Sequence, residues 1–534
     1  MPQLTGGQAV VAGLRRAGIT TLFGIPGVHN GGLYDALLDA PDLRLVITRH
    51  EQGAAFMADG YARASGRTAC VVTITGPGIT NASTGLAEAY GESSPVLHIA
   101  TALGVRRSEP AETGELHELR DQSGLLRALV AHHELVETVA EIPHAIHRGL
   151  RAMADARPGP VSIEIPLDLL TATDDVTLPE PLQVAPRAPS REDVDRAAAL
   201  LADADAPLLF LGSGAMDAGS EAAALAERLH APVLTAQTGK GAIPESHPLA
   251  LGCKNRRDES LYAFLRTRDV ILVVGCRLGA RMTEDGRMPL AQRVIQIDRD
   301  AGALGHAHPV TVALHADAAT ALTELLEALP DQPAPADDGL EAQVHELRRL
   351  PQDGLDAPRS AAILGALREV LPADAVLVND MTLTSYHAAT LFPVEVPRAY
   401  MFPIYFGTLG FSLPAAIGAQ LACPDRPIVS LSGDGGFLFT SEELNTAMRE
   451  SVPVVAVVFN DQSYGAIDGH FRNIFGGRSV DVRLRNPDFV ALGRAYGADA
   501  EGVDRPDALA QAVSRALGRA GPTLIEYRLD PVSP

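Results

Sequence analysis

The chain contains little that would support a disulfide-rich, membrane-spanning or secreted protein. Its 534 residues include four cysteines, and none of them forms a CxxC pair: Cys70, Cys253, Cys276 and Cys423. Scattered thiols of this kind predict neither a disulfide framework nor a zinc site and are typical of a reducing cytosol. No apolar run is long enough to span a bilayer. Residues 1–4 show no basic segment leading into an apolar stretch, so no export signal is predicted and we expect a cytoplasmic protein.

Positive charge is also scarce. The formal net charge is -22, and Lys240 and Lys254 are the only lysines. Binding to nucleic acid requires a basic face that neutralises phosphates, so we expect no nucleic acid partner. Hydrophobic residues make up 46% of the chain, which is ordinary for a globular protein and allows large cores. At about 100–200 residues per domain, this length predicts about three domains.

Three long segments each alternate strand-like and helix-like patterns. This predicts an α/β fold with three doubly wound parallel-sheet domains, at residues 1–175, 190–330 and 357–534. Strands are predicted at 21–25, 43–48, 69–74, 96–100, 207–211, 270–275, 294–298, 428–431 and 452–459, helices at 9–17, 54–65, 81–90 and 442–449, and Pro-rich linkers at 171–189 and 330–339. In the central, Rossmann-like segment, Gly212 and Gly214 lack a third glycine at the fingerprint spacing, so no dinucleotide site is predicted.

The most informative stretch is Gly433-Asp434-Gly435-Gly436, which follows the predicted strand 428–431. A Gly-rich turn that leads into a helix can hold phosphate on backbone N–H groups. The next predicted strand ends at Asn460-Asp461, so Asp434 and Asp461 fall at the carboxyl ends of two neighbouring strands. Two carboxylates beside a phosphate-binding turn suit Mg²⁺, which takes oxygen ligands. The Gly turn alone would favour an ordinary loop; the second acid-bearing strand end favours a cofactor site.

Over nearly its whole length the chain resembles the thiamine diphosphate (ThDP) enzymes of the acetolactate synthase and 2-oxo acid decarboxylase group, which are pyruvate oxidase-like or benzoylformate decarboxylase-like. The resemblance implies a pyrimidine-binding, a central and a diphosphate-binding domain. It assigns Asp434, Asp461 and the backbone carbonyl of Ser463 as Mg²⁺ ligands, with Asn460 as the alternative, and Gly435 and Gly436 as diphosphate contacts. The family usually carries Asn where this chain has Asp461, and the added charge puts the metal affinity in question.

Glu51 lies where a predicted strand ends and a helix begins. Burial would raise its pKa above the ordinary value of about 4.3 and allow proton exchange with a heterocyclic nitrogen. From the residues alone, capping of the helix is the simpler interpretation. Residues 50–62 resemble the family closely, however, and the resemblance assigns Glu51 as the catalytic residue that exchanges a proton with the aminopyrimidine of ThDP. His50 is expected to order the loop.

Residues 406–415 carry a second strong resemblance, although Gly and Pro there also fit an ordinary helix entry. The resemblance implies that Leu409 is an apolar wedge that keeps the coenzyme bent and that the Gly407 carbonyl accepts a hydrogen bond from the 4′-amino group of the coenzyme. Such a wedge would hold the 4′-nitrogen close to the C2 carbon before the reaction. The resemblance further implies cofactor contacts from Pro26, Gly27, Thr75, Gly76, Asn81, Asn379, Asp380, Gly433, Tyr464, Gly465 and Ala466.

The candidate substrate pocket consists of Val28, His29, His117, Gln122, Ile467 and His470, with Tyr464 beside them. The run from Gly24 to His29 is similar to that of decarboxylases of guanidino-type 2-oxo acids. Ile467 is apolar where pyruvate decarboxylases carry an acidic proton donor, which favours carbon–carbon ligation but leaves His29 or His117 as possible donors. A lone histidine in such a loop is more often a satisfied hydrogen-bonding residue.

The leading hypothesis is a ThDP- and Mg²⁺-dependent lyase or transferase that decarboxylates a 2-oxo acid and then either ligates the product to a second carbonyl, as in acetolactate formation, or releases an aldehyde. The alternatives are a simple decarboxylase of a guanidino, branched or aromatic 2-oxo acid, a ThDP-dependent diketone hydrolase, and a non-catalytic ThDP-binding homologue. An NAD-dependent dehydrogenase is disfavoured by the missing fingerprint. We expect no FAD. The resemblance and the repeated strand–Gly turn–helix pattern predict a homodimer with shared active sites, assembled into a homotetramer.

Overall fold

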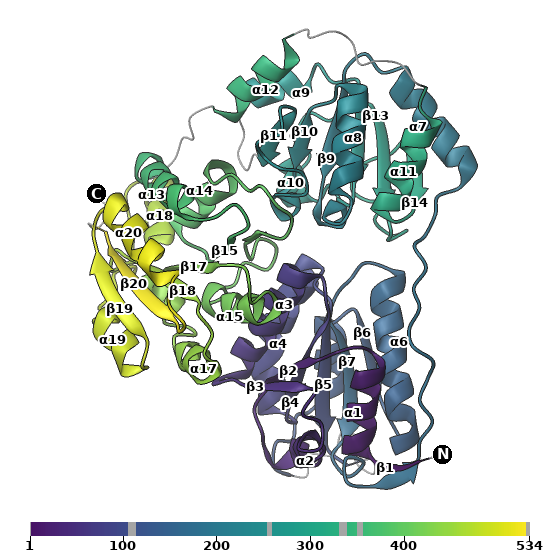
Figure 1. Ribbon diagram of the computed structural model, residues 1–534, viewed down its shortest axis with the longest axis vertical. Coiled ribbons are helices and arrows are strands. Elements are labelled where there is room, and N and C mark those ends of the chain that lie inside the picture. The colour runs from purple at the N-terminus through teal and green to yellow at the C-terminus, as the bar shows by residue number, and fades with distance from the viewer. Residues whose placement is uncertain (1, 105–113, 254–258, 331–338, 350–355, 530–534) are drawn as a thin grey trace. The chain divides into compact units, whose positions relative to one another are not determined.

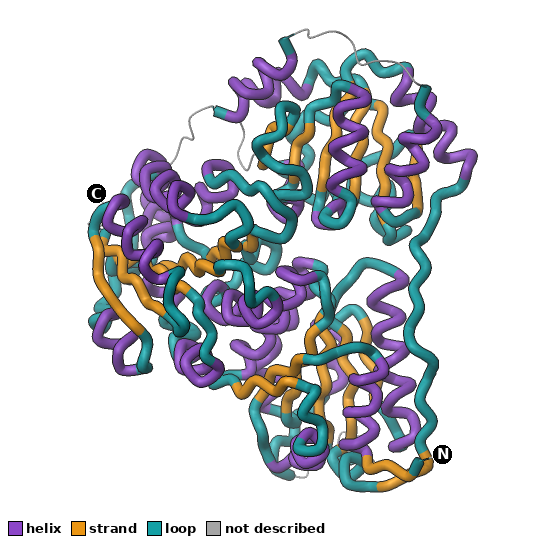
Figure 2. The backbone as a smooth tube through the Cα atoms, in the orientation of Figure 1, coloured by secondary structure: helices purple, strands orange, loops and turns teal. Residues whose placement is uncertain are grey.

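The computed structural model describes residues 2–104, 114–253, 259–330, 339–349 and 356–529. Its backbone divides into two compact units. The first contains Met1–Val184, Leu377–Thr382 and Pro403–Pro534, and the second contains Ala185–Val376 and Leu383–Phe402. Three six-stranded sheets with helical crossovers form the framework, which confirms the predicted α/β fold (Figures 1 and 2).

The N-terminal sheet has the strand order β3-β2-β4-β5-β7-β6, and all its pairs are parallel. Its four inner strands, β2, β4, β5 and β7, are buried along their whole length, as expected when helices cover both faces, whereas the edge strands β3 and β6 are partly exposed. Helices α1 and α6 pack together, as do α3 and α4 (Figure 1). The elements are β1 (Gln3–Thr5), α1 (Gly6–Arg16), β2 (Thr21–Gly24), η1 (Val28–Asn30), α2 (Gly31–Leu37), β3 (Arg44–Ile47), α3 (Glu51–Ser65), β4 (Ala69–Thr73), α4 (Pro77–Glu92), β5 (Val96–Ala102), α5 (Gln122–Leu129), β6 (His132–Leu135), η3 (Val139–Glu141), α6 (Ile142–Asp155), β7 (Val161–Pro166) and β8 (Thr173–Asp175).

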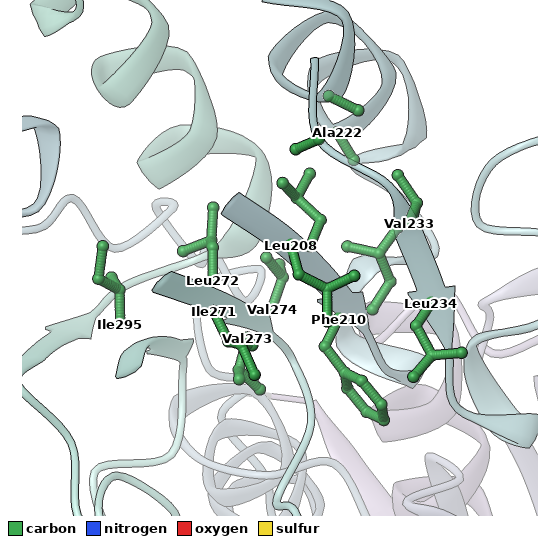
Figure 3. Close-up of a cluster of buried hydrophobic side chains, with 14 of the residues drawn as sticks. Leu208, Phe210, Ala222, Val233, Leu234, Ile271, Leu272, Val273, Val274 and Ile295 are labelled. Carbon is green, nitrogen blue, oxygen red and sulfur yellow. The ribbon is translucent and has the colours of Figure 1, made fainter. Parts of the chain in front are cut away.

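The central sheet has the order β11-β10-β9-β12-β13-β14 and is also parallel. Its core joins strand residues such as Leu208, Phe210 and Ile271 to Ala222 on the covering helix α8 (Figure 3). The elements are α7 (Arg191–Ala202), β9 (Pro207–Leu211), η4 (Ser213–Ala215), α8 (Gly219–Leu229), β10 (Val233–Thr235), η5 (Gln237–Gly239), β11 (Ala250–Cys253), α9 (Glu259–Leu265), β12 (Val270–Val274), α10 (Ala280–Thr283), β13 (Arg293–Asp298), β14 (Val312–His315), α11 (Ala318–Ala328) and α12 (Leu340–Arg348).

The C-terminal sheet has the order β16-β15-β17-β18-β20-β19. Helix α15 packs on α3 of the same unit. The elements are α13 (Ala357–Val370), β15 (Val376–Asn379), α14 (Leu383–Leu391), β16 (Tyr400–Met401), α15 (Ser412–Ala422), β17 (Ile428–Gly433), α16 (Asp434–Phe437), α17 (Glu443–Glu450), β18 (Val455–Asn460), α18 (Gly465–Ile474), α19 (Phe489–Ala495), β19 (Asp499–Val503), α20 (Pro506–Ala516) and β20 (Thr523–Arg528).

Several boundaries differ from the predicted ones for identifiable reasons. Helix α3 begins at Glu51 rather than at residue 54, because His50 Nδ1 accepts the Gln52 N–H and caps it. Helix α4 begins at Pro77, a favoured first helical residue, rather than at 81. The predicted linker 171–189 contains β8, which pairs antiparallel with β1. The predicted linker 330–339 falls largely on 331–338, outside the described residues.

Candidate active site

The strand orders place the two candidate half-sites at matching positions. In the N-terminal sheet the chain order reverses between β2 and β4, and in the C-terminal sheet between β15 and β17. Ligands of open α/β sheets bind outside the carboxyl ends of the strands at such a switch point. The turns after β2, β3 and β4 carry His29, Glu51 and Gly76, and those after β15, β17 and β18 carry Asp380, Asp434 and Asp461.

Glu51 is buried, with 7% of its surface exposed, although it is the first residue of α3. Its carboxylate does not cap the helix; it accepts a hydrogen bond of 2.9 Å from Asn81 Nδ2 on α4. A Cβ at Gly78 would lie 2.9 Å from Ile74 Cγ1 and 3.6 Å from Glu51 Oε1, so this glycine allows α4 to approach Ile74 closely beside the carboxylate. The arrangement leaves Glu51 an anchored acid with little solvent around it.

Glu443 fixes the start of α3 from the C-terminal part of the same unit. Its buried carboxylate accepts the backbone N–H groups of Arg49 and His50 at 3.0–3.2 Å. Burial raises the pKa of Glu443 to about 7. Sequence reasoning missed this residue, since nothing local to position 443 indicates a partner almost four hundred residues earlier.

The turn before α4 is held by Gln122. The N–H of Gly76 donates to Gln122 Oε1 at 2.9 Å, and Gln122 Nε2 donates to the Thr101 carbonyl and to Glu164 Oε1. Gly76 itself has a φ of +66°, and a Cβ there would lie 2.3 Å from the carbonyl oxygen of His117. The side-chain amide of Gln122 therefore holds the turn at Gly76. The absence of a side chain at Gly76 lets the backbone of His117 pack closely against this turn.

His29 and His117, two of the predicted pocket residues, lie together. Their ring centroids are 4.7 Å apart in an edge-to-face arrangement. Burial, followed by the neighbouring His117, lowers the pKa of His29. Ile74 borders both Gly27 and Gly78, so the His29 turn and the surroundings of Glu51 belong to one neighbourhood.

At the C-terminal half-site the carboxylates of Asp434 and Asp461 are both buried, and they are close enough for their charges to interact. Burial raises the pKa of Asp434, and the charge of Asp461 raises it further, to about 6. Burial also raises the pKa of Asp461. A bound divalent cation would offset both effects, so this donor pair fits Mg²⁺. In the described part of the chain no cluster of three or more His, Cys, Asp or Glu side chains suits a metal, so a third protein ligand there would have to be a group such as the Ser463 carbonyl.

Asn460 uses both ends of its side-chain amide in hydrogen bonds. Its Nδ2 donates to Glu526 Oε1 at 2.7 Å, and its Oδ1 accepts from Asn486 Nδ2 at 3.0 Å. Asn486 Nδ2 also donates to Asp434 Oδ2 at 2.6 Å. Asp461 Oδ1 accepts the Ser463 N–H at 3.0 Å, which folds the chain back at the strand end. These contacts support Asp461 over Asn460 as the metal ligand, and they add Asn486, which no sequence motif indicated.

Glycines allow close approach around these acids. A Cβ at Gly435 would lie 2.5 Å from the ring of Tyr464, and one at Gly465 would lie 2.5 Å from Asp461 Oδ2. Gly436 faces Asp380, whose buried carboxylate accepts the N–H groups of Met381 and Ser412. The chain thus forms a narrow turn where backbone N–H groups could meet a diphosphate.

The remaining predicted residues lie at strand ends, in the loop between β16 and α15, and on α18. Thr75 is buried and hydrogen-bonds Thr101, Asn379 is buried on β15, and Gly407 has a φ of +77°. Leu409 is half-buried. Val28 is 86% exposed and Ile467 is 47% exposed, which suits residues that would contact a ligand or a second chain. The others are exposed or half-buried: Pro26, Gly433, Ala466 and His470.

Comparison with known proteins identifies the family of the chain. Family models of thiamine pyrophosphate enzymes match in three parts: the N-terminal TPP binding domain over residues 4–125, the central domain over 194–325 and the C-terminal TPP binding domain over 380–527. The chain therefore belongs to the thiamine pyrophosphate (ThDP) enzyme family, which confirms the resemblance.

The relatives of the chain indicate which type of enzyme within this family it is. The chain is 38% identical to a probable 2-ketoarginine decarboxylase of Pseudomonas aeruginosa, across 98% of this chain and 94% of that protein. It is 33% identical to the large subunit of acetolactate synthase isozyme 2 of Escherichia coli (99% and 96%) and 32% identical to a probable acetolactate synthase large subunit of Methanocaldococcus jannaschii (99% and 92%). It is an enzyme of the ThDP-dependent decarboxylase and acetolactate synthase-like type. None of the described helices combines the length and apolarity needed to cross a membrane.

Proposed function

We propose that this chain binds ThDP and Mg²⁺ and decarboxylates a 2-oxo acid, with Glu51 as the catalytic proton mover. The observation that carries the proposal is the buried Glu51 carboxylate, held by Asn81 at the switch point of the N-terminal sheet. When bound, ThDP supplies the nucleophilic carbon and the electron sink for loss of CO₂. Glu51 would hold a proton at the aminopyrimidine nitrogen, and Leu409 and Gly407 would orient the two rings.

The C-terminal residues would hold the other end of the coenzyme. Asp434 and Asp461 would bind Mg²⁺ together with the Ser463 carbonyl, and the turn at Gly435 and Gly436 would contact the diphosphate. The buried, mutually repelling carboxylates support this role, because a cation relieves the cost of keeping both ionised.

For the substrate we favour a guanidino-type 2-oxo acid with aldehyde release. The similarity to a probable 2-ketoarginine decarboxylase supports this choice. So does the His29–His117 pair, which offers imidazole groups that could deliver a proton to the product. Carboligation is the second candidate, supported by the acetolactate synthase relatives and by the apolar Ile467.

One experiment separates these outcomes. The enzyme loaded with ThDP and Mg²⁺ is incubated with 5-guanidino-2-oxopentanoate, with a branched 2-oxo acid and with pyruvate, and CO₂ release and products are followed by mass spectrometry. We expect a guanidino aldehyde and one CO₂ per substrate. Acetolactate from pyruvate as the main product would establish carboligation, and absence of CO₂ from the whole panel would contradict the proposal.

We also propose a homodimer with shared active sites, assembled into a tetramer. Large apolar side chains are exposed in or beside residues 406–415, the segment that would orient the coenzyme rings. They include Tyr405, Phe406 and Phe439. A second copy of the chain that covers them would bring its own Glu51 to this surface. Sedimentation velocity with and without ThDP tests the assembly.

We further propose a cytoplasmic location. The free thiols, three of them buried, fit a reducing cytoplasm.

A further inference from the structure

A group of buried charges lies between the N-terminal helices and residues 404–411 of the same unit. Asp59 and Arg63 project from α3, and Glu88 and Glu92 from α4. Asp59 and Glu88 are fully buried and Glu92 is 6% exposed. Arg63 approaches Asp59 at 3.7 Å and Glu92 at 3.8 Å. None of these residues belongs to the proposed proton transfer or metal binding.

Two of the carboxylates are bonded to the segment that contains Gly407 and Leu409. Glu92 Oε1 accepts the backbone N–H groups of Ile404 at 2.9 Å and Tyr405 at 3.1 Å. Glu88 Oε2 accepts from Thr408 Oγ1 at 3.2 Å. The segment is therefore attached to α4 at three points, which lie on both sides of Gly407.

The segment needs such anchors because its own backbone does not define one shape. Gly407 and Gly410 both have positive φ, at +77° and +79°. Glycine populates these conformations as readily as many others, so a stretch between two such glycines loses much entropy when it is ordered. Contacts from outside must fix the position of Leu409 and of the Gly407 carbonyl.

The charges of the group do not balance when every acid is ionised. Among the described residues, Asp59, Glu88 and Glu92 lie near the guanidinium of Arg63, so full ionisation of the three acids would bury more negative than positive charge. Burying unpaired charge is costly, so a buried acid in this situation retains a proton. Burial, followed by the charges of Glu92 and Asp59, raises the pKa of Glu88 to about 8, while Arg63 and Thr408 oppose the rise. Burial raises the pKa values of Glu92 and Asp59 as well.

We propose that Glu88 and Glu92 are positioning residues that hold residues 404–408 in the coenzyme-binding shape, and that protonation of the buried Glu88 stabilises this attached form. This inference rests on the proposed function for its consequence, because the segment is the one expected to orient ThDP. It makes the order of the coenzyme segment depend on pH in the absence of any ligand.

The direction of the pH dependence follows from the folded and open forms. When the segment detaches, Glu88 meets water and its pKa returns to the ordinary 4.5. Opening therefore releases a proton between pH 4.5 and about 8, and becomes easier by up to about tenfold per pH unit in that window. Above about 8, Glu88 is ionised in both forms and the dependence ends.

The test is hydrogen–deuterium exchange of the full chain without cofactor, at several pH values from 6 to 9, with rates corrected for intrinsic exchange. In the wild type we expect the protection of residues 404–411 to fall by up to about tenfold per unit up to pH 8 and then level off. Glu88→Gln, which stays neutral, should reduce the slope, and any remainder comes from Glu92 and Asp59, whose pKa values are also raised. Glu180→Gln, an exposed position in the same unit, is the matched control and should keep the slope.

A slope that persists unchanged in Glu88→Gln would overturn the inference. If that variant does not fold, Thr408→Val and Thr408→Ser replace it: loss of the hydroxyl should lower protection at pH 6, its retention should not, and equal protection in both would also overturn the inference. Calorimetric titration with ThDP and Mg²⁺ is run in parallel. Absence of any ThDP binding with an intact exchange slope would contradict the proposed function while leaving the positioning role supported.

Discussion

The three sheets share one architecture but differ at their switch points. In the central sheet the chain order reverses between β9 and β12. The turns that follow these two strands contact each other through the backbone of glycine residues. A Cβ at Gly214 would lie 2.7 Å from the Cα of Gly275, which itself has a φ of +57°. Buried carboxylates lie at the two other sites: Asp434 follows β17, a switch-point strand, and Glu51 follows β3, the neighbour of β2, and is bonded to Asn81 on α4, the helix after β4. The fold supplies the location, and the residues placed there decide whether it carries chemistry.

The largest expected effect comes from the N-terminal switch point. Glu51→Gln keeps the size and one oxygen of the side chain but cannot exchange the proton. We expect turnover to fall by about 10²–10⁴-fold, the usual contribution of a positioned acid or base, while ThDP affinity is retained. Steady-state kinetics with calorimetric titration checks this; full activity in the variant would remove the assignment.

Substitutions at the C-terminal switch point should weaken cofactor binding, whereas Glu51→Gln should slow turnover. Asp434→Asn removes a proposed ligand charge, and we expect Mg²⁺-dependent ThDP affinity to fall by at least about 100-fold, because outer-shell partners alone contribute about 10–100-fold. Asp461→Asn is the matched control: it makes the same change at a position where the family usually carries Asn, so a smaller loss is expected. Equal losses in both would show that charge rather than oxygen geometry holds the ion.

Asn486 tests whether the acid pair depends on its neighbours. It donates to Asp434 and to Asn460, so Asn486→Ala frees Asp434 to rotate. We expect a loss of about 10–100-fold in Mg²⁺ affinity, with an unchanged melting temperature when ThDP and Mg²⁺ saturate the enzyme. An unchanged affinity would place Asn486 outside the metal site.

The central switch point should respond only in stability. Gly275→Ala adds a methyl 2.4 Å from the Cα of Gly214 in a backbone conformation that favours glycine. We expect a loss of about 1–3 kcal/mol in the free energy of unfolding of the central part and no change in ThDP affinity. Reduced ThDP affinity in the folded variant would erase the contrast between the switch points.

A smaller, graded effect is expected from His98 in the N-terminal sheet. Its ring is buried between Thr73 and Ser162, and burial lowers its pKa to about 3. Because the unfolded chain takes up this proton near pH 6.5 and the folded chain does not, stability is lost as pH falls from 6.5 towards 3, by up to about 1.4 kcal/mol per unit. Urea unfolding of the wild type and of His98→Gln between pH 7 and 5 measures the slope, which the variant should reduce.

Much of this organisation was predictable from local patterns. The apolar runs and the glycine turns after them predicted the strands and the place of Asp434, and the segment around Glu51 predicted a strand end followed by a helix. The packing of distant side chains was not predictable. Glu443 at the start of α3, Asn486 beside Asp434 and Glu88 beside Thr408 are ordinary surface-type residues in sequence, and only the fold brings them to buried partners. His50 showed its capping role only once its ring was placed.

The short pairing of β1 with β8 ties the first residues of the chain to the segment that leaves the N-terminal sheet, with Gln3 opposite Asp175. The N-terminal part is thereby a closed loop whose two ends are neighbours. We expect this third of the chain to accept a short peptide bridge between those ends and new termini elsewhere on its surface, as in a circular permutant.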